Sequence, residues 1–211
     1  MAKLVYYYGA MNSGKSIALM KDAYNLEEKG YNTLLIKSTV DTKGDNMIVS
    51  RIGLAKKVNI YLKPTDSLLS DENLLKYDNV SLILVDEAQF LTEEQIEELW
   101  KITKILDIPV NCYGLRTDFT TRTFTGSKRL FELADYVEEL KNICECMKLA
   151  KFNARKVNGK YVMEGESVVI DGEANVEYVP LCGKCYMEQV MGYNIEKLKK
   201  KFLHKKPNVF L

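Results

Sequence analysis

The segment GAMNSGKS at residues 9–16 constrains the fold more than any other feature of the chain. It fits the pattern G-x-x-x-x-G-K-[ST] of a phosphate-binding loop, and it follows residues 4–8, an apolar run with strand composition. Residues 17–29 have helical character and stop at Gly30, so the strand–loop–helix order that the motif requires is present. We therefore expect a phosphate site here. The alternative is a glycine-containing turn that matches the pattern by chance.

Each part of this loop has an expected role. Its glycines let backbone N–H groups approach an anion, and the following helix adds the positive end of its dipole. Lys15 would reach the β- and γ-phosphates of a nucleotide, and the hydroxyl of Ser16 would be a ligand of Mg²⁺. The residues expected to bind the nucleotide here are Gly9, Ala10, Met11, Asn12, Ser13, Gly14, Lys15 and Ser16.

The segment LILVDEAQF supplies the acid that a phosphate-binding loop needs as its partner. Residues 80–85 form a continuous apolar run, which is typical of a parallel strand covered on both faces. Asp86 follows this strand and is the natural acid to contact Mg²⁺, either directly or through water. Glu87 can turn toward the γ-phosphate and accept a proton from water or from a substrate hydroxyl. Ala88 and Gln89 complete the expected nucleotide-binding set. The alternative is that Asp86 and Glu87 simply begin a surface loop.

Strand and helix signals alternate over the first two thirds of the chain. Thr92 is a suitable N-cap for a helix because Gln95 follows three residues later. Residues 40–56 show no clear periodicity and predict a long loop. This alternation predicts an α/β fold with a P-loop, RecA-like parallel sheet. Beyond the elements around the phosphate loop, we expect strands at 33–38, 80–85, 109–115 and 136–140, and helices at 92–106 and 127–134.

Length and charge limit the function classes. The chain has 211 residues, enough for one domain with a small appendage, and its net charge of +1 gives no strong field to attract nucleic acid or a membrane. No apolar run approaches the ~20 residues of a membrane span. The N-terminus runs directly into the first expected strand, so we expect no secretory signal and a cytoplasmic location. There, the five cysteines would be reduced or metal-bound.

Four of the cysteines form two close pairs, Cys144-x-Cys146 and Cys182-x-x-Cys185. Four thiolates suit a tetrahedral structural Zn²⁺. The alternatives are four ordinary thiols, or a zinc ribbon that binds nucleic acid; the second is disfavoured because the surrounding sequence is neither strongly basic nor rich in clustered aromatic residues. Cys112 lies in an apolar strand and is expected in the core.

The chain changes character after residue 141. Asn158 and Gly159 are a strong hairpin signal between residues 148–157 and 160–163, and residues 164–179 predict a glycine-containing loop. The lysine-rich residues toward the C-terminus favour a solvated helix or a frayed end. The predicted division is a P-loop domain at 1–141, a small zinc-stapled hairpin and lasso domain at 142–192, and a basic tail at 193–211.

Two classes of function compete at this point. The DEAQ segment is close to helicase-type boxes, which would indicate a nucleotide-driven motor, whereas a small-molecule kinase needs the same phosphate loop and acids. Motors usually need two nucleotide-binding domains or an oligomeric ring. One P-loop domain with an appendage therefore favours the kinase.

Four motifs taken in order resemble the zinc-containing, type II thymidine kinase family, most closely its bacterial branch. They are YYYGAMNSGKS, VDEAQF, CYGLRTDF and the lasso pattern VVIDG…Y…C. The last two are the specific ones, and the resemblance runs over residues 4–186. It implies an ATP-dependent kinase that converts thymidine, and also deoxyuridine, to the monophosphate in nucleotide salvage. The family also implies a homotetramer that dTTP inhibits by feedback.

The resemblance also implies roles for individual residues. Glu87 would be the general base that takes the proton from the 5′-hydroxyl of thymidine, and Lys15 would stabilise the transferring phosphoryl group. Asp86 and Ser16 would hold Mg²⁺, while Cys144, Cys146, Cys182 and Cys185 would hold structural Zn²⁺. Phe119 would stack on thymine in a pocket shared with Met11 and Leu115. The lasso residues Val168, Val169, Ile170, Asp171 and Gly172 would bind the base through their backbone, and Tyr178 would hold the sugar. Asp171 stands where the family commonly has a glycine.

Overall fold

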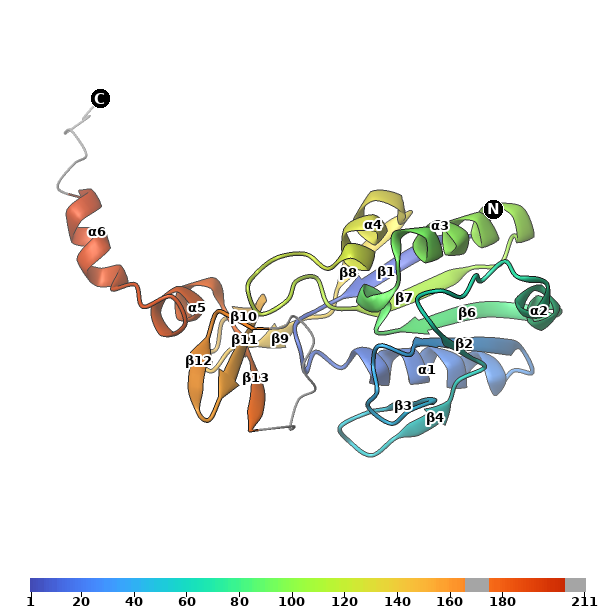
Figure 1. Cartoon of the computed structure of the whole chain (residues 1–211), viewed down its shortest axis with the longest axis horizontal. Helices are drawn as coiled ribbons and strands as arrows, with labels where there is room; N and C mark the ends of the chain where they lie inside the picture. Colours follow the sequence, from blue (N-terminus) through green and yellow to red (C-terminus); the bar gives the residue numbers. More distant parts are fainter. Residues whose placement is uncertain (166–174, 204–211) are drawn as a thin grey trace, which may run out of the picture.

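The computed structural model describes residues 1–165 and 175–203 and has two parts, a layered α/β unit and a smaller, strand-rich unit (Figure 1). The α/β unit is built on a six-stranded sheet with the order β5-β2-β6-β7-β1-β8. Every neighbouring pair in this sheet is parallel, which confirms the predicted fold class. The strands are β1 (Leu4–Tyr8), β2 (Asn32–Ser38), β5 (Ile60–Leu62), β6 (Val80–Asp86), β7 (Val110–Gly114) and β8 (Tyr136–Glu139).

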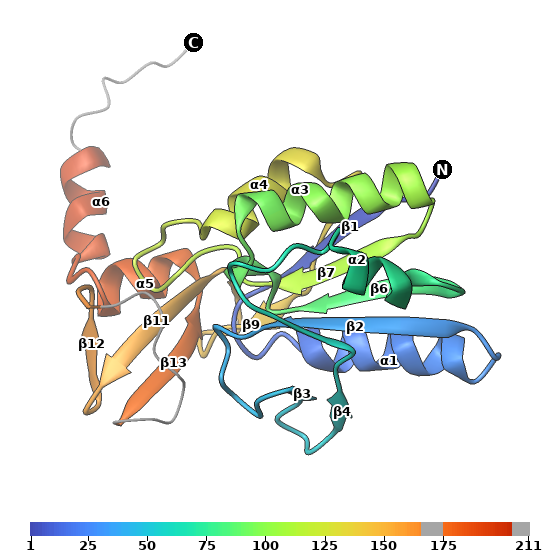
Figure 2. The ribbon, with the colours of Figure 1, turned by 45° about the vertical axis from the view of Figure 1, so that its right-hand side comes forward.

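Helices cover both faces of this sheet, and the apolar strands are buried as a result. Helix α1 (Lys15–Glu27) lies on one face, and α3 (Glu93–Lys101) and α4 (Thr125–Leu133) lie on the other (Figure 2). Leu19 of α1 packs with Leu35 and Leu84 in one core cluster, while Ile96 of α3 belongs to the cluster of the opposite face. Two-sided covering explains why these strands are continuously apolar.

Helix α3 begins as the sequence predicts and ends differently. The side chain of Thr92 accepts from the backbone of Gln95 while the Gln95 side chain accepts from the backbone of Thr92, which is the expected capping box. The α-helix stops at Lys101, and a π-helical turn, Ile102–Leu106, completes the predicted length. The hydroxyl of Thr103 donates to the carbonyl of Trp100 at 2.7 Å and so competes with the regular helical hydrogen bonds.

The segment expected as a loop at 40–56 contains a short antiparallel hairpin. Its strands are β3 (Met47–Val49) and β4 (Ala55–Lys57), with Met47 paired to Lys57. Ile48 is buried against α1 and the sheet, and this contact with a distant element accounts for a hairpin that the local sequence pattern does not show. A short helix, α2 (Asp71–Leu74), and a 3₁₀ turn at Leu75–Tyr77 lie between β5 and β6.

The smaller unit is a three-stranded antiparallel sheet with the order β12-β11-β13. Its strands are β11 (Phe152–Val157), β12 (Lys160–Val162) and β13 (Val176–Leu181). Asn158 and Gly159 have φ angles of 51° and 76°, the double left-handed geometry of a two-residue hairpin turn, as the sequence predicts. The last residues of the loop expected at 164–179 belong to a strand instead, because β13 begins at Val176 and pairs with β11.

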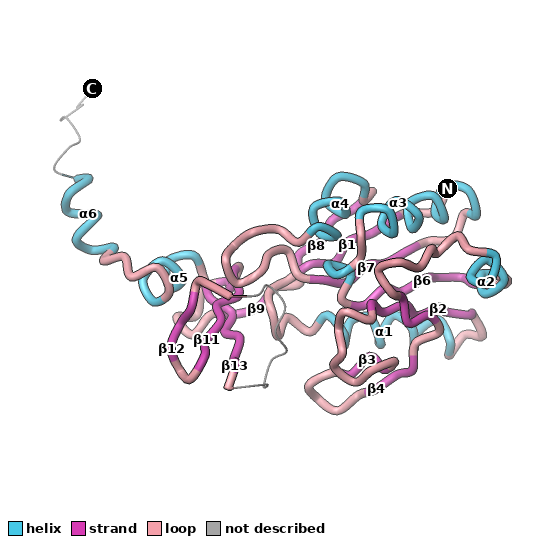
Figure 3. Tube along the Cα trace, viewed as in Figure 1, coloured by secondary structure: helices cyan, strands magenta, loops and turns pink. Residues whose placement is uncertain are grey.

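The remaining elements flank this sheet. Strands β9 (Asn142–Ile143) and β10 (Leu149–Ala150) form a separate pair, and α5 (Gly183–Gln189) packs on β11 and β13. Helix α6 (Ile195–Leu203) projects away from the rest of the molecule with no buried residue, in line with a solvated helix (Figure 3). Among residues 1–165 and 175–203, we find no helix with the length and apolarity needed to cross a membrane.

Candidate active site

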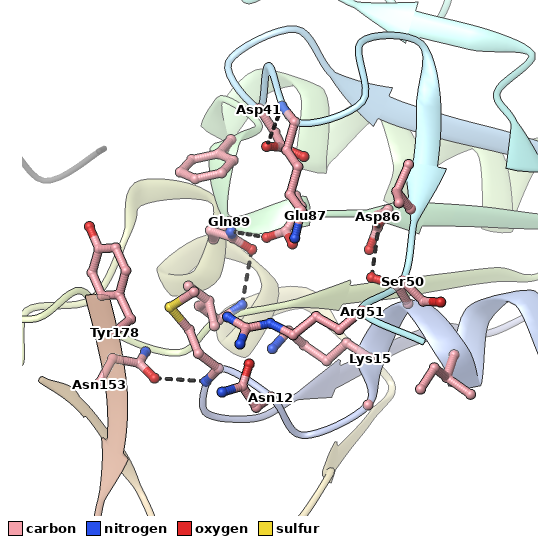
Figure 4. Close-up of a pocket in the computed structure, with 18 of the residues that line it drawn as sticks. Asn12, Lys15, Asp41, Ser50, Arg51, Asp86, Glu87, Gln89, Asn153 and Tyr178 are labelled. Atoms are coloured by element: carbon pink, nitrogen blue, oxygen red, sulfur yellow. Dashed lines mark hydrogen bonds between the residues drawn. The ribbon is translucent and has the colours of Figure 1, made fainter. Parts of the chain in front are cut away.

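A cavity of about 330 Å³ opens where the sheet strands end and the smaller unit begins. The phosphate loop, the end of β6 and the segment after β2 line one end of it, and residues that follow β7 and Tyr178 of β13 line the other. Figure 4 shows polar and charged groups from these elements directed into one space. Ligands of open parallel sheets bind at this edge, so the position fits a substrate site.

The phosphate loop joins β1 to α1 as its motif predicts. Gly14 has a φ angle of 80° and directly precedes the first residue of α1, Lys15. At Gly9, a Cβ atom would lie 2.4 Å from Ser13 Oγ and 2.5 Å from the carbonyl oxygen of Leu140, so this close approach requires glycine. Met11, Asn12, Gly14, Lys15 and Ser16 line the cavity, whereas Gly9, Ala10 and Ser13 shape the loop behind it.

The Lys15 side chain is buried and folds back onto the loop. Its ammonium donates to the carbonyl of Ala10 at 3.0 Å and to that of Gly9 at 3.5 Å. Burial lowers the pKa of Lys15, while the nearby carboxylates of Glu87 and Asp86 raise it. The cation therefore has two acidic neighbours at the place where a phosphate chain would enter.

Asp86 and Glu87 lie at the end of β6 and point in different directions. Asp86 Oδ2 accepts from the hydroxyl of Ser16 at 3.5 Å, and its other carboxylate oxygen, Oδ1, is buried without a hydrogen-bond partner among the described residues. Burial, followed by the Glu87 carboxylate, raises the pKa of Asp86 to about 8. An orphaned carboxylate oxygen beside a serine hydroxyl suits a hard cation such as Mg²⁺.

Glu87 leaves the strand with a left-handed backbone, φ 49° and ψ 41°. This turn brings the second acid toward the cavity, as the sequence predicts. Gln89 Nε2 donates to Glu87 Oε2 at 2.5 Å, and Gln89 Oε1 accepts from the backbone N–H of Leu115 at 2.9 Å. Gln89 thus ties the Glu87 carboxylate to the end of β7, while Ala88 is buried and does not line the cavity.

The opposite end of the cavity is apolar. Phe119 and Tyr178 are buried together in a small cluster with Met11 packed against it, and Leu115 also lines the cavity. The guanidinium of Arg155 lies over the Phe119 ring, with Cζ 3.6 Å from the ring centroid, so one face of this ring is covered by a side chain of the protein. The expected lasso residues Val168, Val169, Ile170, Asp171 and Gly172 lie outside the described residues.

Asn153 is a cavity residue that the sequence does not reveal. Its Oδ1 accepts from the backbone N–H of Met11 at 2.7 Å, and its Nδ2 donates to the carbonyl of Thr117 at 3.1 Å. A single asparagine in a hairpin strand carries no motif, so no local signal could have identified it. The same holds for Phe90 and Phe124, an edge-to-face pair at the cavity wall.

The segment between β2 and β4 forms the wall over the phosphate end. Asp41, Lys43, Ser50 and Arg51 from this segment line the cavity. Asp41 is one of the carboxylates that raise the pKa of Asp86. The phosphate end is therefore enclosed by charged residues of both signs, which suits a bound polyphosphate with a metal ion.

The four predicted zinc cysteines meet in the smaller unit. The Sγ atoms of Cys144, Cys146, Cys182 and Cys185 all lie within 4.8 Å of one another. The backbone N–H of Cys185 donates to Cys182 Sγ and is the main reason that the pKa of Cys182 is lowered to about 7. Four converging thiols, one of them readily ionised, fit a tetrahedral Zn²⁺. Cys112 lies apart from them, buried in β7 as expected.

Comparison with known proteins places these features in a family. A family model described as thymidine kinase matches residues 2–186. A thymidine kinase of Photorhabdus laumondii is 43% identical over 194 residues, covering 90% of this chain and 94% of that protein. A thymidine kinase of Legionella pneumophila strain Paris is 42% identical over 214 residues and covers 100% of both chains. The crystal structure of a DNA replication initiation factor is also similar, at a TM-score of 0.39 and 19% identity over 66% of this chain and 40% of that one, which is too distant to bear on function.

Proposed function

The chain belongs to the thymidine kinase family, and we propose that it transfers the γ-phosphate of ATP to the 5′-hydroxyl of thymidine, and of deoxyuridine, to supply nucleotides for DNA synthesis. The observation that carries this proposal is one cavity with two chemically different ends. A phosphate loop with paired acids lies at one end, and a buried aromatic cluster lies at the other. A nucleoside whose base occupied the aromatic end would direct its sugar hydroxyl toward the acids.

We propose Glu87 as the general base. Its carboxylate lines the cavity beside the phosphate loop, and the hydrogen bond from Gln89 fixes its orientation. Accepting the 5′-hydroxyl proton would make that oxygen nucleophilic as it attacks the γ-phosphate. Lys15 would give up its carbonyl contacts and stabilise charge on the transferring phosphoryl group.

Asp86 and Ser16 would hold Mg²⁺ at this end of the cavity. The buried oxygen Asp86 Oδ1 and the adjacent Ser16 hydroxyl support this assignment. When bound, the ion would neutralise charge on the phosphates. The other residues of the loop, together with Ala88 and Gln89, would contact the nucleotide through their backbone or shape the site around it.

The nucleoside would occupy the apolar end. Met11, Leu115 and Phe119 would contact the base, and Tyr178 would contact the sugar, since all four line the cavity. Residues 168–172 would close over the base. Exclusion of water by this closure would favour transfer to the nucleoside over hydrolysis.

We propose that residues 142–192 act as a zinc-stapled lasso domain attached to the P-loop domain of residues 1–141, with a basic tail from 193 to 211. The six-stranded sheet ends with β8 at Glu139, and the smaller unit starts with β9 at Asn142, which supports this boundary. Zinc would act structurally, because all four ligand positions are cysteines and none is left open for substrate.

Assembly and regulation follow from family analogy. We propose a cytoplasmic homotetramer that is inhibited by dTTP and that has no nucleic-acid partner and no membrane partner. The net charge of +1 supports the lack of a nucleic-acid or membrane partner, and cysteines without disulfides in the described residues agree with a cytoplasmic location.

One assay tests the proposed reaction. Purified protein is incubated with γ-labelled ATP, Mg²⁺ and a panel of nucleosides, and labelled monophosphate is separated from free phosphate. We expect dTMP as the main labelled product at saturating thymidine. Free phosphate as the main product, with stimulation by single-stranded DNA, would instead indicate a motor-type ATPase.

A further inference from the structure

One buried lysine outside the catalytic set contacts the segment that borders the phosphate end of the cavity. Lys37 is the penultimate residue of β2 and is only 1% exposed. It is paired in the sheet with Asp86, yet its ammonium is directed into the loop that follows β2. A lysine is rarely this deeply buried without a specific set of partners.

The partners of Lys37 all come from one short stretch of chain. Its Nζ donates to the carbonyl of Lys43, to that of Asp45 at 3.0 Å and to that of Met47 at 3.1 Å. The same atom lies 3.1 Å from the carboxylate of Asp41. An ammonium has three N–H groups, so these three carbonyls use its whole donor capacity while the Asp41 carboxylate balances its charge.

Residues 42–46 have few other means of being held in place. All of their side chains are exposed, so no buried side chain anchors this stretch. Gly44 and Asp45 both have left-handed backbones, with φ angles of 73° and 48°, which turn the carbonyls inward. The stretch is therefore held mainly by hydrogen bonds to its backbone. Those from Lys37 join the carbonyls of Lys43, Asp45 and Met47 to a single atom.

The cavity residues of this segment lie within the anchored stretch and on both sides of it. Asp41 precedes the stretch, Lys43 belongs to it, and Ser50 and Arg51 follow it after β3. Movement of residues 42–46 would displace both groups from the phosphate end.

We propose that Lys37 is a positioning residue that holds the segment of residues 41–51 over the polyphosphate of ATP, and so sets the affinity for ATP without contacting it. The proposal rests on the proposed function in that it takes the occupant of this end to be ATP. It predicts that loss of Lys37 changes KM for ATP and not KM for thymidine, because the nucleoside pocket is built from other elements.

The principal test replaces Lys37 by methionine, which is similar in length and cannot donate a hydrogen bond. We expect Lys37→Met to raise KM for ATP by about tenfold or more, since the carbonyls of Lys43, Asp45 and Met47 lose their shared donor, while KM for thymidine changes less than about twofold. The matched control is Lys56→Met. Lys56 belongs to β4 of the same hairpin, but it makes a partly exposed ion pair with Glu27. Lys56→Met should keep the wild-type KM for ATP.

A structural readout accompanies the kinetics. Limited proteolysis within residues 42–54 should be about tenfold faster in Lys37→Met than in wild type, and a non-hydrolysable ATP analogue should protect the variant less. A variant with wild-type KM for ATP and wild-type protection would overturn the proposal. Equal rises in both KM values would overturn it too, because they would indicate a general structural defect.

If Lys37→Met does not fold, lysine labelling of the wild-type protein tests the proposal. A lysine-acylating reagent with detection by mass spectrometry should label Lys37 slowly, and the ATP analogue should slow it further, while Lys56 labels quickly under both conditions. A Lys37 labelling rate that the analogue leaves unchanged would refute the proposal. Wild type that makes no dTMP but shows this protection would refute the proposed nucleoside kinase reaction and leave the anchoring role of Lys37 in place.

Discussion

The two units of the molecule are built around different kinds of core. The sheet unit buries large aliphatic and aromatic side chains on both faces, with Leu4, Tyr6 and Ile83 fully covered. The core of the smaller unit contains Cys144, Cys182 and Cys185 alongside few large aliphatic residues. Burial of apolar surface stabilises the first unit, whereas we expect the second to depend more on metal binding by its cysteines. The two units should therefore respond differently to loss of metal.

The largest effect should come from loss of one zinc ligand. We expect Cys182→Ser to lose its zinc and to unfold the smaller unit while the sheet unit persists, because a structural metal site contributes folding free energy directly. Hydrogen exchange would then increase over residues 142–186 and stay slow in β1, β6 and β7. The same substitution in the other core, Cys112→Ser, should retain zinc. Full activity in wild-type protein that contains no zinc would contradict this account.

The next largest effect should separate chemistry from folding within the sheet unit. Glu87→Gln keeps the side-chain shape, and removal of a general base typically lowers the rate by ~10²–10⁴. We expect that fall in kcat with unchanged zinc content and thermal stability, and no recovery at high Mg²⁺. Glu93→Gln, an exposed change in the first turn of α3, should leave kcat unchanged. A Glu87→Gln enzyme with near-normal kcat would require a different base.

A smaller effect should appear at the contact between the units. Asn153→Ala leaves the N–H of Met11 and the carbonyl of Thr117 without their partners, which costs about 1–3 kcal/mol for a buried group. Thermal unfolding and KM for thymidine should both report this loss. Asn32→Ala removes an exposed hydrogen bond to Asn79 far from the cavity and serves as the control. Equal behaviour of the two variants would mean that the contact does not couple the units.

The smallest effect should be purely conformational. Gly159 has a φ angle of 76° and open space where a Cβ would lie, so Gly159→Ala should cost ~1–2 kcal/mol through backbone strain alone. Gly183→Ala, at the start of α5 with a Cβ 3.4 Å from Phe152, should be close to neutral. The two melting temperatures, measured with zinc present, test this difference. A neutral Gly159→Ala would show that the hairpin tolerates another turn.

Local chemistry explains what the sequence could predict. The phosphate loop, the Asp86–Glu87 pair and the Asn158–Gly159 turn each need a particular residue type at a fixed spacing, so a single segment reveals them. Asn153 contacts residues that are distant in the chain, and Lys37 contacts backbone carbonyls. No spacing rule in the sequence predicts contacts of either kind. The β3–β4 hairpin escapes sequence-based prediction for the same reason, since Ile48 is buried only when α1 and the sheet come together.

Two side chains of the smaller unit form hydrogen bonds with the backbone of Met11. Asn153 accepts from its N–H at 2.7 Å, and Asn142 Nδ2 donates to its carbonyl at 2.8 Å. Protein engineers could not treat the two units as interchangeable modules, because a transplanted smaller unit would need both amides in register with a foreign phosphate loop. An exchange of units during evolution would meet the same constraint, so the two parts are expected to have been inherited together.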